Sequence, residues 1–162
     1  MMSNPLLDKD LIFLNKDVKN YEEIFELLGH AMIEKGYAKD TYIHGLKDRE
    51  SQYPTGVPVN PIGVAIPHTD ASYVNESKIG VMTLKESVPF GVMGTDGEQV
   101  DVRIVILLGL SDSGTHLKAL QSVIELIQSE SFIRDMLELE TQEDALNLLN
   151  NQLLSKLEEE VK

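Results

Sequence analysis

The chain has 162 residues, 42% of them hydrophobic, and its 27 acidic and 14 basic side chains give a formal net charge of −13. This length and composition are typical of one globular domain, so we expect residues 1–162 to form a single domain with a charged tail from about residue 158. So acidic a surface repels phosphate backbones, which argues against a nucleic-acid partner.

The absence of cysteine excludes disulfides, thiolate metal sites and cysteine nucleophiles. The start of the chain lacks the pattern of a signal peptide, and no apolar run approaches the ~18 residues of a membrane-spanning helix. The sequence therefore predicts a cytoplasmic protein.

Hydrophobic periodicity and turn residues predict strands in the middle of the chain, with helices before and after them. In chain order we expect a strand at 11–14, a helix from a cap at 17 or 20 to Gly36, a helix at 40–52, strands at 62–66, 79–84 and 102–110, a hairpin or loop at 88–99, and helices starting at 112–115, 129–131 and 141. The run at 102–110 is apolar enough to be a strand buried on both faces. This order predicts an α/β sandwich.

One stretch places a histidine directly after a predicted strand: residues 63–70 read Gly-Val-Ala-Ile-Pro-His-Thr-Asp. Pro67 fixes its own φ and removes a backbone donor, so strand pairing stops there and the imidazole of His68 is aimed. Imidazole has an ordinary pKa near 6.5 and is a nucleophile near pH 7 when neutral. On spacing alone, an ordinary surface histidine after a strand is the alternative interpretation.

Three further histidines lie on predicted helices. His30 and His44 are interpreted as helix-surface or partly buried residues. His116 differs, because it lies in the first turn of the helix that follows the most apolar strand, behind a Ser-Asp-Ser-Gly-Thr loop. Backbone amides at a helix start favour an anion, so we predict that His116 and His68 meet at one edge of the sheet, where they face a phosphate or another oxyanion.

Arg49 could supply a fixed guanidinium for phosphoryl oxygens, although a helix-end ion pair with Asp48 or Glu50 is the alternative. Other chemistries fit less well. His68 and Asp70 lack the further ligands of a metal site, and neither a Gly-x-Ser-x-Gly nucleophile elbow nor a phosphate loop is present. We therefore expect no cofactor and no metal, and we expect any phosphoryl group to arrive on another protein.

The stretch ending at His68, Gly-Val-Ala-Ile-Pro-His, is similar to the active-site motif of the fructose/mannitol-type enzyme IIA proteins of the bacterial sugar phosphotransferase system. The block at 49–56, Arg-Glu-Ser-Gln-Tyr-Pro-Thr-Gly, resembles the segment ahead of that motif. Residues 90–97, 105–108 and 115–120 resemble the family's second half. The similarity thus extends from about residue 10 to residue 150.

The resemblance implies a mixed central β-sheet flanked by helices on both faces. It implies that His68 accepts a phosphoryl group from the phosphocarrier histidine protein and passes it to a cysteine of enzyme IIB, which serves a membrane permease. His116 matches the second histidine of the family site, which orients and stabilises the phosphoryl group, and Arg49 matches an arginine that lines the same pocket.

Two departures from the family pattern indicate a particular branch. Thr69 stands where many members have Gly, Ala or Cys, and Pro58, Asn60 and Pro61 replace a glycine-rich approach to the strand. The altered approach after Tyr-Pro-Thr-Gly is most similar to the galactitol-type branch, so galactitol is the predicted sugar.

Two other functions remain open from the sequence. One is a regulatory module of the same fold, whose phosphorylation state is sensed by a partner, and the other is a small protein in which His68 and His116 only bind an anion. For a transient partner interface we also predict an apolar collar around His68. The residues predicted to form it are Val57, Val59, Ile66 and Leu110.

Overall fold

A five-stranded mixed sheet forms the centre of the computed structural model, which describes residues 5–155; the predicted charged tail lies outside them. The strand order is β1-β4-β5-β3-β2, with β1 parallel to β4, β4 antiparallel to β5, β5 parallel to β3 and β3 antiparallel to β2. The strands are β1 (Ile12–Lys16), β2 (Gly56–Val57), β3 (Gly63–Ala65), β4 (Lys78–Gly91) and β5 (Gln99–Gly109).

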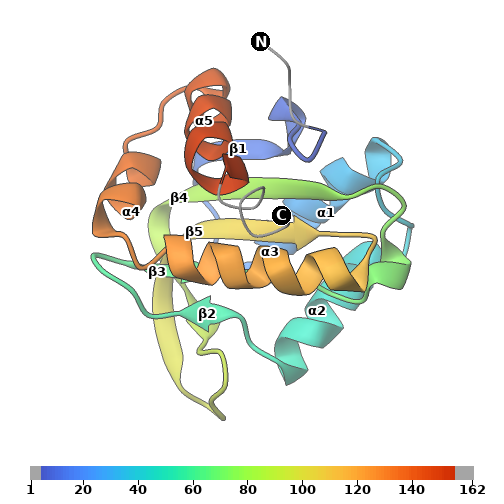
Figure 1. Cartoon of the computed structure of the whole chain (residues 1–162). Helices are drawn as coiled ribbons and strands as arrows, with labels where there is room; N and C mark the ends of the chain where they lie inside the picture. Colours follow the sequence, from blue (N-terminus) through green and yellow to red (C-terminus); the bar gives the residue numbers. More distant parts are fainter. Residues whose placement is uncertain (1–4, 156–162) are drawn as a thin grey trace.

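Helices cover both faces of this sheet, with α3 in front and α1 behind in Figure 1. Their bounds are α1 (Tyr21–Glu34), α2 (Tyr42–Gln52), α3 (Ser113–Leu126), α4 (Glu130–Leu137) and α5 (Gln142–Leu149), with short helical turns η1 (Lys9–Leu11), η2 (Ala71–Tyr73) and η3 (Asn150–Leu154). Two hydrophobic clusters fill the layers, one beneath α1 and α2 and one beneath α3, α4 and α5. The predicted α/β architecture is confirmed.

Local capping signals set the helix boundaries much as the sequence predicts. The Asn20 side chain accepts a hydrogen bond from the Glu23 amide at the start of α1, and Gly36, at φ +76°, follows its end. Thr141 caps α5 by accepting from the Asp144 amide. These contacts involve residues a few positions apart, which is why sequence reasoning finds them.

The sheet extends beyond the prediction in two places. β4 continues seven residues past the predicted end at 84, after a register shift between Thr83 and Val88 across three exposed residues. The predicted hairpin is present, but Phe90 lies inside β4 and is fully buried. The short strand β2, which is not among the predicted strands, pairs with β3.

The topology brings two chain segments to one sheet edge. Because β3 and β5 are parallel, their carboxyl ends point the same way, and the chain leaves them toward His68 and toward α3. Gly63 lets β3 approach β5 closely, since a Cβ there would lie 2.6 Å from the Asp101 carbonyl oxygen.

In residues 5–155, no helix combines the length and the hydropathy that a bilayer crossing requires.

Replacing Gly63 with alanine is expected to lower the free energy of unfolding by about 1–3 kcal/mol, because the new methyl group meets backbone that cannot rotate away. Urea unfolding measures this change. Gly114→Ala is the matched control: its Cβ would have no neighbour closer than 3.6 Å, and alanine is the better helix former. Equal losses in the two variants would contradict the close-approach argument.

Candidate active site

The structure brings His68 and His116 together. His68 follows β3 by three residues, and His116 lies in the first turn of α3, just after β5. Their ring centroids are 4.8 Å apart and the rings are inclined at 69° to each other. A surface depression of about 350 Å³ surrounds them, lined by Arg49, His68, Thr69, Asp70, Ala71, Ser113, His116, Leu117 and Leu120.

Hydrogen bonds to Thr55, directly before β2, and to strand β5 hold the backbone ahead of His68. The Ile66 amide donates to the Thr55 carbonyl at 3.1 Å, and the Pro67 carbonyl accepts from the Leu108 amide of β5 at 3.1 Å. The Ile66 carbonyl in turn lies 2.8 Å from Nδ1 of His68. Because a carbonyl oxygen can only accept, Nδ1 of the neutral ring carries the proton, which leaves the lone pair on Nε2.

Both imidazoles are held in the neutral form. Burial lowers the pKa of His68, and the nearby Arg49 guanidinium lowers it further, against the opposing effect of the hydrogen bond to Ile66. Burial, followed by the proximity of His68 and Arg49, lowers the pKa of His116 to about 4. At neutral pH the site therefore presents two uncharged rings beside one fixed cation.

Arg49 lies in the last turn of α2, with its guanidinium carbon 4.4 Å from the centroid of the Tyr53 ring. Such stacking holds a guanidinium without neutralising it. The alternative of a helix-end ion pair is wrong: Asp48 accepts from Gln52, Glu50 accepts from Thr55, and no described carboxylate lies within 4 Å of Arg49. The charge of Arg49 is therefore available to an anion in the depression.

Glu50 is a buried carboxylate that the sequence analysis assigned to no site. It accepts two hydrogen bonds from Thr55, one from the amide and one from the hydroxyl, each 2.7 Å long. Burial raises the pKa of Glu50 to about 7, although both bonds act in the opposite direction. Through Thr55 and Ile66, Glu50 supports the carbonyl that orients His68. Its spacing from buried Tyr42 and Leu46, four residues apart along α2, is the sequence signal that was missed.

The start of α3 differs from the predicted anion site. The Asp112 carboxylate already accepts from the Thr115 amide at 3.0 Å and from the Thr115 hydroxyl at 2.7 Å. A carboxylate of the chain thus occupies part of the helix terminus, and His116 contributes to the site through its ring. The other two histidines lie apart from this site: His30 pairs with Glu34 at 3.2 Å, and His44 is exposed on α2.

The predicted apolar collar is wrong for Ile66 and Leu110, which are fully buried in the core beneath α3. Val57 and Val59 are partly buried and pack against the same core. The apolar side chains that do reach solvent around the site are different ones. Tyr53 is 59% exposed beside Arg49, and Leu117 is 57% exposed in the lining of the depression.

Hydrophobic periodicity predicts a buried helix stripe of Leu117, Leu120, Val123, Ile124 and Ile127, and for Leu117 this prediction is wrong. The buried face of α3 consists of Ala119, Ser122 and Val123, and Leu117 in the first turn points elsewhere.

Within residues 5–155, no group of three or more His, Cys, Asp or Glu side chains is arranged to hold a metal ion.

The mixed sheet flanked by helices makes this an α/β protein, with paired imidazoles beside the carboxyl ends of β3 and β5. Comparison with known proteins identifies its family. The family model described as "Phosphoenolpyruvate-dependent sugar phosphotransferase system, EIIA 2" matches residues 5–152. The chain therefore belongs to this enzyme IIA family, whose members are phosphotransferase components that carry phosphoryl groups. The resemblance found from the sequence is confirmed.

Individual relatives agree with this assignment. The chain is 30% identical to the mannitol-specific phosphotransferase enzyme IIA component of Geobacillus stearothermophilus, over 92% of this chain and 98% of the relative. It is 28% identical to the galactitol-specific EIIA component of Escherichia coli, over 87% and 91%. The mannitol enzyme IIA of Escherichia coli, solved in complex with phosphorylated enzyme IIB, shares the fold with a TM-score of 0.73 and 23% identity, over 90% and 97%.

The buried carboxyl of Glu50 predicts a pH-dependent stability. Its pKa is raised from 4.5 to about 7 on folding, so the unfolded chain loses this proton first and stability falls as pH rises from about 4.5 to 7. Glu50→Gln, which keeps the shape and can donate to the Thr55 hydroxyl, is expected to remove this component. Urea unfolding at pH 5 and pH 7.5 measures it as a wild-type loss of about 2–3 kcal/mol relative to the variant.

Asp48→Asn, an exposed neighbour on the same helix, is the control and is expected to retain the wild-type pH profile. A Glu50→Gln profile parallel to that of the wild type would show that Glu50 ionises normally in the folded protein.

The Arg49 guanidinium lowers the pKa of both His68 and His116, so its removal is expected to raise both. NMR titration of the imidazole ring signals in Arg49→Gln measures the two shifts. Arg103→Gln, which removes a guanidinium from β5 that bonds the Leu84 carbonyl, is the matched control and should leave both titrations unchanged. Unchanged titrations in Arg49→Gln would place its charge away from the rings.

Proposed function

We propose that this protein is a phosphocarrier in which His68 accepts a phosphoryl group on Nε2 and passes it on. The observation that carries the proposal is the hydrogen bond between Nδ1 of His68 and the Ile66 carbonyl, 2.8 Å long. It fixes the tautomer and leaves one defined nitrogen with a free lone pair. The lowered pKa of His68 keeps this ring unprotonated at neutral pH, as a nucleophile requires.

The proposed reaction has two steps, and each needs only this protein and one partner, first a phosphoryl donor and then an acceptor. Nε2 of His68 attacks phosphorus in line, and the N–P bond to His68 forms as the donor's N–P bond breaks. In the second step the thiolate of an acceptor cysteine attacks, so an S–P bond forms and Nε2 recovers its lone pair. Arg49 offsets the charge of the phosphoryl oxygens, and the ring N–H of neutral His116 donates a hydrogen bond to them.

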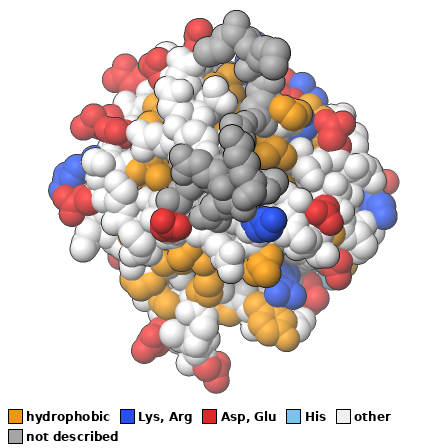
Figure 2. Space-filling view, in the orientation of Figure 1, with side chains coloured by type: hydrophobic (Ala, Val, Ile, Leu, Met, Phe, Trp, Pro, Cys, Tyr) orange, Lys and Arg blue, Asp and Glu red, His pale blue; other side chains and the backbone are white. Residues whose placement is uncertain are grey.

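The proposed donor is the phosphocarrier histidine protein and the proposed acceptor is enzyme IIB, which serves a membrane permease. In support, the mannitol enzyme IIA that shares this fold was solved with phosphorylated enzyme IIB. Exposed Tyr53 and Leu117 beside the depression offer apolar contacts to a partner. Figure 2 shows hydrophobic side chains gathered in the lower half of the α3 face, with acidic groups mainly toward its outline.

The proposed place of reaction is the cytoplasm, in keeping with the prediction from the sequence. For the sugar we propose a hexitol. Relatives specific for mannitol and for galactitol match at 30% and 28% identity. These similar identities support a hexitol without favouring the predicted galactitol over mannitol.

Intact-protein mass spectrometry after incubation with phosphoenolpyruvate, enzyme I and the phosphocarrier histidine protein tests the proposal. Wild type is expected to gain one acid-labile phosphoryl adduct, and His68→Ala to gain none. His116→Ala, which removes one donor to the phosphoryl oxygens, is expected to slow adduct formation by about 10²–10³-fold.

His44→Ala, an exposed histidine on α2, is the control and should be phosphorylated at the wild-type rate. An adduct on His68→Ala would move the acceptor to another residue. No adduct on wild type would contradict the phosphocarrier and the regulatory roles alike and leave anion binding as the function. The mass of enzyme IIB, measured after incubation with the phosphorylated protein, separates the transport role from the regulatory one. Transfer to its cysteine supports the transport role.

A further inference from the structure

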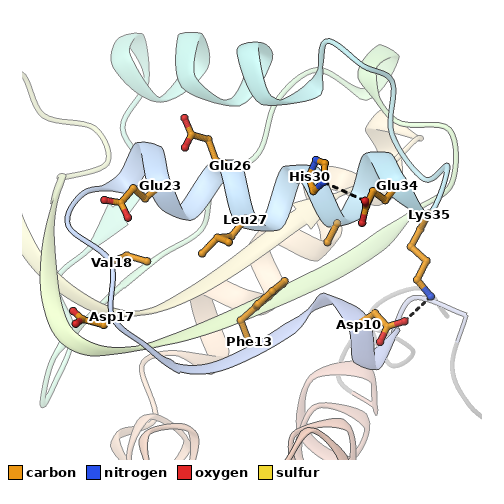
Figure 3. A pocket seen from close by; sticks show the side chains of 11 residues that line it. Asp10, Phe13, Asp17, Val18, Glu23, Glu26, Leu27, His30, Glu34 and Lys35 are labelled. Carbon is orange, nitrogen blue, oxygen red and sulfur yellow. Dashed lines mark ion pairs between the residues drawn. The ribbon is translucent and has the colours of Figure 1, made fainter.

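A second surface feature lies between β1 and α1, a groove of about 830 Å³ (Figure 3). Its lining shares no residue with the depression around His68. In the sheet, β4 and β5 separate β1 from β3, the strand that leads to His68. The groove is therefore a feature that the phosphocarrier reaction does not use.

The floor of the groove is apolar. Leu27 projects from α1 toward Phe13 on β1, as Figure 3 shows, and Val18 and Ala31 are the other apolar residues of the lining. Leu27 is 40% exposed, and the only other large hydrophobic residues exposed in the described part of the chain are Tyr53 and Leu117, both beside the histidine site. An exposed leucine facing an aromatic ring across a groove offers a dry contact for a partner side chain.

The rim of the groove is acidic. Five carboxylates line it: Asp10, Asp17, Glu23, Glu26 and Glu34. Three of them have cationic or histidine partners, because Lys35 lies 2.6 Å from Asp10, Lys47 lies 2.8 Å from Glu26 and His30 lies 3.2 Å from Glu34.

Asp17 and Glu23 differ from the other three carboxylates. Within residues 5–155, neither has a Lys, Arg or His nitrogen within 4 Å. Both lie at the same end of the groove, on either side of Val18 in Figure 3. This end therefore carries two uncompensated negative charges next to an apolar surface.

We propose that the groove binds a basic amphipathic helix of a partner protein, whose apolar side chain inserts between Phe13 and Leu27 and whose Lys or Arg side chains reach Asp17 and Glu23. Charge complementarity selects a basic occupant, and the acidic rim repels phosphorylated segments and anionic membranes. The lining of α1 from Glu23 to Glu34 is about 16 Å long, which matches three turns of a docked helix.

An extended segment fits this place less well. Such a segment binds best by adding to a free strand edge. The Gln142 side chain already donates to the carbonyls of Lys9 and Ile12, at 2.9 and 3.0 Å, where the chain enters β1. The helix-in-groove mode requires none of these backbone groups.

The test uses a synthetic peptide of about 14 residues, built from Lys, Leu and Ala so that Lys and Leu occupy opposite faces of a helix. Titration into isotope-labelled full-length protein is expected to shift the amide signals of β1 and α1 with saturable, salt-weakened binding. A peptide of the same composition in scrambled order, with no apolar face, is expected to bind at least about tenfold more weakly.

Variants locate the binding. The double variant Asp17→Asn, Glu23→Gln is expected to weaken binding about tenfold, and Leu27→Arg to abolish it. The matched control Asp96→Asn, Glu98→Gln removes two exposed carboxylates from the β4–β5 hairpin and is expected to change affinity by less than about twofold. His68→Ala should bind the peptide as wild type does. Circular dichroism confirms that each variant is folded.

Three outcomes would overturn the proposal. Signal shifts centred on the histidine depression would place the peptide there instead. Equal weakening by the two double variants would show attraction by net charge alone. Absence of saturable binding to the folded wild-type protein would show that the groove does not accept a basic helix.

Discussion

The hydrogen bond from Nδ1 of His68 to the Ile66 carbonyl is the interaction on which the site depends. It determines which nitrogen can react, and it works only if the carbonyl stays in place. Hydrogen bonds on two sides hold that segment, since the Ile66 amide donates to the carbonyl of Thr55, directly before β2, and the Pro67 carbonyl accepts from the Leu108 amide of β5. The orientation of His68 therefore depends on the register of the sheet. It also depends on Gly63, which lets β3 approach β5 closely.

The electrostatics of the site depend on Arg49, whose guanidinium is not paired with a carboxylate. The chain carries a net charge of −13, yet the described carboxylates around Arg49 bind elsewhere: Asp70 accepts from Ser72, Asp112 from Thr115 and Glu50 from Thr55. Arg49 is held instead by an aromatic ring. An incoming phosphoryl group brings up to about two negative charges. Among the described residues that line the depression, Arg49 is the one Lys or Arg side chain, and no carboxylate neutralises it.

Sequence reasoning found the parts of this site that local rules determine. Proline after a strand predicts the position of His68, and capping residues predict the start of the helix that carries His116. It failed where tertiary packing decides. The exposure of Leu117 depends on how α3 lies on the sheet, and the extra length of β4 depends on its pairing with β5. The role of Glu50 was not predicted: its spacing along α2 indicates that it is buried, but not that its carboxylate accepts from the amide and the hydroxyl of Thr55.

The depression around His68 and the groove between β1 and α1 are suited to different tasks. Three strand spacings separate β1 from β3, about 14 Å, whereas the Debye length at physiological ionic strength is about 8 Å. Charge added at His68 is therefore largely screened, through solvent, from the carboxylates of the groove. A basic helix in the groove would then bind the phosphorylated and unphosphorylated forms with similar affinity. Such a surface suits attachment of a partner, which raises its local concentration, rather than sensing of the phosphorylation state.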